Sequence, residues 1–129
     1  MNPDNSMIHH LHKSGFLLCT ALVFWGLYEI SVYNYLLFHS LVEMFSIAVA
    51  LAIFMMVWNS RHFIDNGSLK ILGCAYLFIS LIDLGHTLAF KGMGAFQGYG
   101  ANLPTQLWIA ARYMQGFTLL AAPFLPTES

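Results

Sequence analysis

The chain has 129 residues, of which 58% are hydrophobic and 9% charged, and its formal net charge is −1. Soluble domains carry about 25% charged residues, so this composition excludes an ordinary soluble domain and predicts an integral membrane protein. A net charge near zero also offers no basic surface for nucleic acid. The two cysteines, Cys19 and Cys74, form no disulfide or zinc motif and are interpreted as buried small hydrophobic residues.

The first two apolar segments are predicted to be transmembrane helices over about residues 15–33 and 36–58. Each is close to the roughly 20 residues that cross the hydrocarbon core, where backbone groups must pair within a helix. The link at Tyr33-Asn34-Tyr35 is so short that the segments form either a tight hairpin or one bent helix. Residues 1–14 are expected to be a cytoplasmic amino-terminal tail, and no small-residue cleavage site for a signal peptide follows the first segment.

Two further transmembrane helices are predicted over about residues 69–90 and 104–125. The Asp65-Asn66-Gly67 turn signal precedes the third helix, and a Gly-rich loop precedes the fourth. Proline at position 104 suits the first turn of a helix. Residues 126–129 remain as a carboxy-terminal tail. The sequence therefore predicts an all-α integral membrane bundle of about four transmembrane helices.

Basic residues indicate how the bundle is oriented. Lys13, Arg61 and Lys70 fall on one side of the predicted spans, and Lys91 falls on the other. Because cytoplasmic loops are enriched in lysine and arginine, both termini are expected in the cytoplasm and the Gly-rich loop outside.

Ionisable residues within the predicted spans lie at a similar depth, in the outer half of the bilayer. They are His39 and Glu43 in the second helix, Asp83 and His86 in the third, and Arg112 in the fourth. A charged side chain near the bilayer centre costs about 2.5–3.5 kcal/mol, so these groups are expected to pair. Arg112 with Asp83 or with Glu43 is the natural pair, because a guanidinium can donate two hydrogen bonds to one carboxylate.

Helical spacing places these residues on three faces that line a polar core. The faces are His39, Glu43, Ser46 and Ala50; Gly73, Tyr76, Ser80, Asp83 and Thr87, with His86 beside them; and Thr105, Trp108, Arg112 and Gln115.

Three interpretations of this polar core stay open. It is a ligand site or proton-sensitive switch, a structural network that holds the helices in register, or a haem or metal site with His39 and His86 as ligands. A visible absorption spectrum without a Soret band would remove the haem alternative. Lys91, beside the amino end of the fourth helix, is a weaker candidate for attracting a small anion. No nucleophile–base pair stands out, so an enzyme is not expected and no cofactor is assigned.

Three stretches carry a family resemblance: "NYLLFHSLVEMFSIAVALAIFMMVWNSR", "LGCAYLFISLIDLGHTLAFKGMGAF" and "GANLPTQLWIAARYM". In this order they resemble the third type of bacterial membrane-associated sensor domain, the MASE group. The resemblance implies a sensory input domain of the bacterial inner membrane, as found at the amino end of histidine kinases of two-component systems and of diguanylate cyclases. The positions that match its polar signature are His39, Glu43, Asn59, Arg61, Asp83, His86, Thr87, Lys91, Trp108 and Arg112.

The sequence departs from this family at its carboxy-terminal end. Members continue through further helices into a cytoplasmic output domain, whereas this sequence ends at "APFLPTES". The expectation is a sensory input module without its own output domain, either truncated or coupled to an output domain on another chain. Its expected partners are the lipid bilayer, that output domain, and a small molecule or proton as stimulus. The alternatives are a haem- or metal-binding membrane subunit and an inert membrane fragment.

Overall fold

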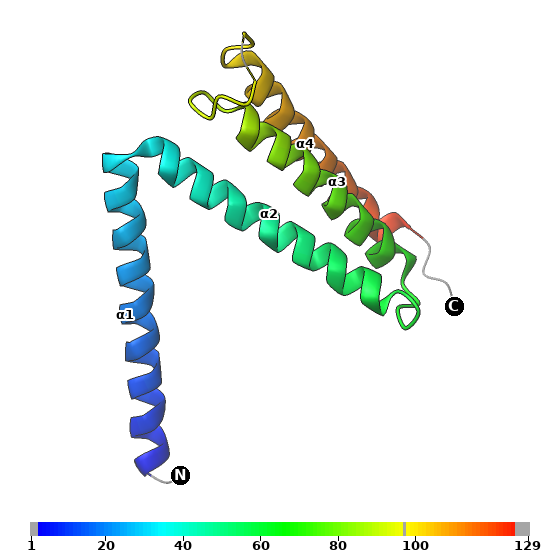
Figure 1. Cartoon of the computed structure of the whole chain (residues 1–129). Helices are drawn as coiled ribbons and strands as arrows, with labels where there is room; N and C mark the ends of the chain where they lie inside the picture. Colours follow the sequence, from blue (N-terminus) through cyan, green and yellow to red (C-terminus); the bar gives the residue numbers. More distant parts are fainter. Residues whose placement is uncertain (1–2, 97, 126–129) are drawn as a thin grey trace. The chain divides into compact units, whose positions relative to one another are not determined.

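The structure is a computed structural model that describes residues 3–96 and 98–125, with side chains placed from residue 12 onward. Within these ranges the chain is all-α, with four α-helices and a short 3-10 helix (Figure 1). This confirms the predicted fold class, while the predicted tail 126–129 lies outside the described residues. The elements are α1 (Pro3–Tyr33), α2 (Tyr35–Ser60), α3 (Gly67–Ala89), α4 (Asn102–Ala121) and η1 (Ala122–Phe124).

Two helix ends differ from the prediction. Helix α1 begins at Pro3, so helical backbone covers most of the predicted amino-terminal tail. Proline is favoured at the first position of a helix, because its missing N–H has no partner there in any case. Helix α4 ends at Ala121 instead of residue 125, and η1 with Pro123 follows it. A proline within a helix removes a backbone hydrogen bond and clashes with the preceding turn.

Three of the helices in the described ranges are long and apolar enough to cross a membrane. These segments are His12–Tyr33, Tyr35–Ser60 and Gly67–Ala89. The sequence predicted about four spans, but α4 does not qualify by hydropathy, which Asn102, Gln106, Arg112 and Gln115 lower.

The chain divides into two units, Met1–His39 and Ser40–Ser129. The first unit holds α1 and the start of α2. Asn34 separates these helices: its N–H donates to Ile30 O at 2.8 Å, and its Oδ1 accepts from Leu37 N–H at 3.0 Å. Helical hydrogen bonds therefore continue on both sides of a one-residue break.

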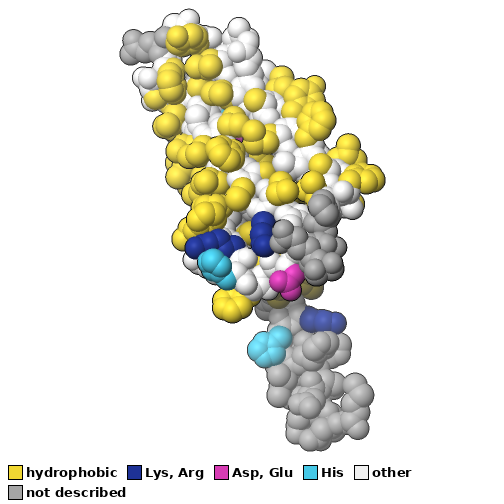
Figure 2. All heavy atoms as spheres, turned by 90° about the vertical axis from the view of Figure 1, so that its right-hand side faces the viewer, with side chains coloured by type: hydrophobic (Ala, Val, Ile, Leu, Met, Phe, Trp, Pro, Cys, Tyr) yellow, Lys and Arg dark blue, Asp and Glu magenta, His cyan; other side chains and the backbone are white. Residues whose placement is uncertain are grey.

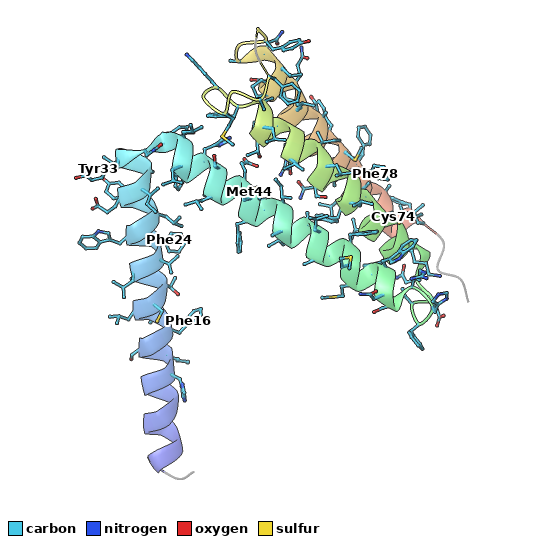
Figure 3. All side chains as sticks on the ribbon, viewed as in Figure 1. Phe16, Phe24, Tyr33, Met44, Cys74 and Phe78 are labelled. Atoms are coloured by element: carbon cyan, nitrogen blue, oxygen red, sulfur yellow. The ribbon has the colours of Figure 1, made fainter. Side chains whose placement is uncertain are left out.

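Large hydrophobic side chains of α1 are exposed between Phe16 and Tyr33. Phe16 and Phe24 are 72% and 67% exposed, and Figure 3 shows both projecting from the helix. For a segment with the composition of a membrane span, these are surfaces for acyl chains.

The second unit holds the rest of α2 together with α3, α4 and η1. Helices α3 and α4 pack side by side and are joined by the loop at residues 90–101 (Figure 1). The buried apolar residues are mostly small or branched, which allows the helices to approach closely. They are Ile47 and Ala50 on α2, Ile79 and Ala89 on α3, and Ala111 on α4.

Helices α2 and α3 approach each other closely at Gly73. A Cβ atom at this position would lie 2.6 Å from the Cβ of Val57, which is too short for any real contact. The absence of a side chain on Gly73 thus sets how closely α3 approaches α2.

The start of α3 is fixed by Asn66, whose Oδ1 accepts from the N–H groups of Ser68 and Leu69 at 2.9 and 3.3 Å. An N-cap of this kind stabilises a helix by about 1 kcal/mol.

The outer surface of the bundle is apolar. On the face shown in Figure 2, hydrophobic side chains cover much of the molecule, and charged side chains gather toward one end. Met44 and Phe78, labelled in Figure 3, are 52% and 56% exposed. Cys19 and Cys74 are exposed as well, so the prediction that both are buried is wrong. The mean hydropathy of an apolar segment does not report which of its residues face protein and which face lipid.

Candidate functional site

The second unit contains a buried ion pair between α3 and α4. Asp83 is only 2% exposed, and its Oδ2 accepts a hydrogen bond from Nη2 of Arg112. Asp83 lies on the predicted stripe of α3, where Gly73, Ser80 and Thr87 are buried with it. Arg112 faces it from the middle of α4, with its side chain 38% exposed. Of the two acids that the sequence proposed for Arg112, the structure selects Asp83.

The Asp83–Arg112 pair is only partly satisfied. Asp83 Oδ1 and Arg112 Nε are both buried and have no hydrogen-bond partner among the residues that the structure describes. The guanidinium therefore meets the carboxylate through one donor, although a fork of two parallel hydrogen bonds is available to this pair. A buried polar atom without a partner costs about 1–3 kcal/mol, so the pair is not optimally satisfied in this arrangement.

A second polar pair joins α2 to α3. His86 Nε2 lies 3.9 Å from Glu43 Oε1, and their side chains are 8% and 18% exposed. His86 Nδ1 lies 2.8 Å from Pro104 O. Because a carbonyl oxygen only accepts, Nδ1 carries a proton and Nε2 is the atom that faces Glu43. The polar residues thus form two pairs, Asp83–Arg112 and Glu43–His86, one helical turn apart on α3.

A cavity of about 340 Å³ lies between α2, α3 and α4, and the Asp83–Arg112 pair forms part of its wall. One side is apolar and comes mainly from α2, while the polar groups come mainly from α3 and α4. This volume is within the range of small-molecule pockets, about 300–1,000 Å³. The lining residues are Val42, Phe45, Ser46, Val49, Ala50, Ile53, Tyr76, Ile79, Asp83, Arg112 and Gln115.

The other predicted site residues are not among those that line this cavity. His39 is a half-buried residue of the first unit, where its ring stacks on Tyr35 with centroids 6.3 Å apart. Lys91 is exposed in the loop after α3. Haem or metal ligation by His39 and His86, and anion binding at Lys91, stay predictions.

The polar signature of the resemblance includes residues in different environments. Thr87 is buried, and its hydroxyl donates to Asp83 O at 2.8 Å. Arg61, near the end of α2, donates to Trp58 O at 2.7 Å and stacks over the Trp58 ring. Trp108 is 46% exposed and Asn59 is exposed.

The predicted face of α4 is only partly right. Arg112 and Gln115 line the cavity, but Thr105 and Trp108 are exposed, and Pro104 and Ala111 are buried instead. The contact of Pro104 O with His86 was also missed. It depends on the loop that sets the register between α3 and α4, and no local pattern reports such a contact.

Comparison with protein families gives a match over most of the chain. The family model MASE3, described as a membrane-associated sensor domain, matches residues 30–129. The matched range includes all of α2, α3 and α4, and therefore both polar pairs and the cavity. Comparisons with curated proteins and with solved structures found no match.

Proposed function

The chain belongs to the MASE3 family of membrane-associated sensor domains, and we propose that it is the sensory input module of a bacterial signalling system. In this proposal the second unit detects a stimulus within the membrane and passes it to a cytoplasmic output domain of the histidine kinase or diguanylate cyclase type. The switch is the Asp83–Arg112 pair. Multi-pass membrane helices and the family match support this role.

The observation that carries the proposal is the buried, half-satisfied ion pair beside a cavity. Placing a charged residue near the bilayer centre costs about 2.5–3.5 kcal/mol, and residues of this kind usually mark a functional site. A purely structural contact between membrane helices is well served by uncharged hydrogen-bonding groups, which supply modest stabilisation without a buried charge. The charged pair therefore supports a switch better than a purely structural contact between the helices.

The proposed mechanism uses the two geometries open to Arg112. In one geometry a single donor meets Asp83, and in the other the guanidinium fork engages both carboxylate oxygens. The change in geometry alters the position of α4 relative to α3. The carboxy-terminal end of α4 transmits this displacement to the output domain. A stimulus shifts the equilibrium only by its difference in affinity for the two states, and about 1.4 kcal/mol of difference shifts it ten-fold.

The experiment fuses the full chain to a diguanylate cyclase output domain and measures the cyclic dinucleotide product in membranes. Asp83→Asn removes the charge that holds Arg112, so one geometry is lost and basal output should change by about ten-fold in either direction. Asp65→Asn is the matched control, since it makes the same chemical change in the exposed loop before α3. Unchanged output from Asp83→Asn at equal membrane level would refute the switch.

We also propose that α4 crosses the membrane beside α3, which leaves both termini in the cytoplasm. Its 20 residues extend about 30 Å, enough to span the hydrocarbon core. Its low hydropathy fits a helix whose polar residues face a bundle interior, as Arg112 and Gln115 do. Arg61 and Lys70, near one end of α2 and α3, support a cytoplasmic position for that end.

Cysteine labelling tests this topology. In a Cys19→Ala, Cys74→Ala background, Phe96→Cys should react with a membrane-impermeant maleimide in intact cells. His62→Cys and Phe124→Cys should react only after the membrane is opened, because both lie on the cytoplasmic side. Labelling of Phe124→Cys in intact cells would contradict a fourth crossing.

A further inference from the structure

The position of the cavity restricts how a ligand reaches it. All of its lining residues lie in the middle portions of α2, α3 and α4, and none comes from a loop or a helix end. On the α2 side, Phe45 and Val49 are 73% and 44% exposed. The cavity thus meets the outer surface of the helices at mid-height, where a membrane span borders acyl chains. A molecule that enters from this side must be soluble in the bilayer.

The charges of the cavity favour an uncharged molecule. Asp83 and Arg112 are the ionisable residues of opposite charge in its wall, and they neutralise one another. The remaining lining residues carry apolar or polar side chains without a carboxylate, ammonium or guanidinium group. An ionic ligand would bring an unpaired charge into this environment, at a cost of several kcal/mol.

The unsatisfied atoms indicate the head group. Asp83 Oδ1 is an acceptor without a donor, and Arg112 Nε–H is a donor without an acceptor, among the residues described. A hydroxyl group is the smallest neutral group that both donates and accepts. Gln115 adds an amide to the same wall, and Val42, Val49 and Ile53 offer an apolar surface for the rest of the molecule.

We propose that this cavity binds an uncharged, membrane-soluble molecule through a hydroxyl head group, with its apolar body against α2. Asp83 Oδ1 and Arg112 Nε are covered in the present geometry, so the hydroxyl enters as the Arg112 side chain shifts. Its 38% exposure leaves room for that movement. Binding thereby acts on the ion pair itself. The role of this ligand as the stimulus of a sensor rests on the proposed function, whereas its binding to the cavity can be measured separately.

The test uses the purified full chain in phosphatidylcholine nanodiscs. A hexadecanol that carries a diazirine is compared with the matching diazirine-bearing hexadecane, which lacks the hydroxyl. After illumination, mass spectrometry should find the alcohol on residues 42–53 of α2 about ten-fold more than the hydrocarbon, since one buried hydrogen bond is worth about that factor. Equal labelling by both probes, or alcohol labelling elsewhere, would overturn the proposal.

Competition identifies the source of the hydroxyl. Unlabelled hexadecanol represents a lipid alcohol, and decylubiquinol represents a membrane quinol. Protection of residues 42–53 by either one supports the site and assigns its ligand to that source. Protection by neither one contradicts the site.

Three variants keep the interpretation of the test independent of folding. Val49→Trp fills the rim of the cavity and should abolish the preference for the alcohol, while Val23→Trp makes the same change on the exposed face of α1 and should preserve it. If Val49→Trp does not elute as a folded species, Asp83→Asn, which keeps the shape of the side chain, should still reduce the preference. Preference retained in folded Val49→Trp or in folded Asp83→Asn would overturn the proposal.

The outcome separates this inference from the proposed function. Specific labelling together with an output that ignores Asp83→Asn would refute the signalling switch and leave the binding site standing. An output that responds to Asp83→Asn, without specific labelling, would refute the binding site alone.

Discussion

Replacing Arg112 with methionine is expected to lower the free energy of unfolding by about 3–5 kcal/mol, because it leaves a buried charge without its partner. Asp83 is 2% exposed, and its Oδ2 loses the donor that the structure provides. Methionine keeps much of the side-chain volume, so the loss reports the charge more than the packing. Unfolding in detergent micelles, followed by circular dichroism during titration with dodecyl sulfate, measures the effect.

A double-mutant cycle isolates the ion pair. In an Asp83→Asn background the buried carboxylate is absent, so Arg112→Met no longer leaves an unpaired Asp83 charge and should cost only about 1 kcal/mol. Lys91→Met is the matched control, since Lys91 is an exposed cation in the loop after α3 and should change stability by no more than about 0.5 kcal/mol. If Arg112→Met costs the same with and without the Asp83 carboxylate, the ion pair does not stabilise the α3–α4 contact.

Replacing Gly73 with alanine is expected to destabilise the bundle by about 1–3 kcal/mol through overpacking. The new methyl group would lie 2.6 Å from the Cβ and Cγ1 atoms of Val57, so α2 and α3 must move apart. The displaced atoms belong to the stem of a short, β-branched side chain on a helix, which has little freedom to yield. The same titration in detergent measures the change.

The matched control for Gly73→Ala is Gly85→Ala, on the same helix. A Cβ atom on Gly85 would lie 3.7 Å from Leu107 Cδ1, an ordinary contact. Alanine in a helix interior is favoured over glycine by up to about 1 kcal/mol, so this variant should be neutral or more stable. We expect Gly73→Ala to lower the stability of the bundle and Gly85→Ala to leave it unchanged or raise it. Equal effects of the two substitutions on stability would show that Gly73 does not limit the α2–α3 distance.

Composition and hydropathy were enough to predict the membrane class, the all-α fold and the approximate position of each helix. These properties depend on averages over some 20 residues and on the need to satisfy backbone groups in lipid, so they survive errors at single positions. Helix ends were less predictable. The start of α1 at Pro3 and the end of α4 at Ala121 depend on local backbone choices that hydropathy does not report.

The face of α3 was also predictable from sequence. Polar and small residues at helical spacing stand out against an apolar background, and the structure buries Gly73, Ser80, Asp83 and Thr87 together. On α4 the same reasoning failed in part, because Trp108 belongs to the exposed side and Ala111 to the buried side. Where one helix offers polar residues on several sides, spacing alone does not decide which side meets a neighbour.

By itself, the sequence determined that this chain is a helical membrane protein with the residues of a sensor domain, and that its buried charges must find partners. Only the tertiary structure decided that Arg112 pairs with Asp83 while Glu43 lies beside His86, and that a cavity remains between three helices. The physical reason is that rotation and distance between helices come from contacts between distant residues. The approach of Gly73 to Val57 is one such contact.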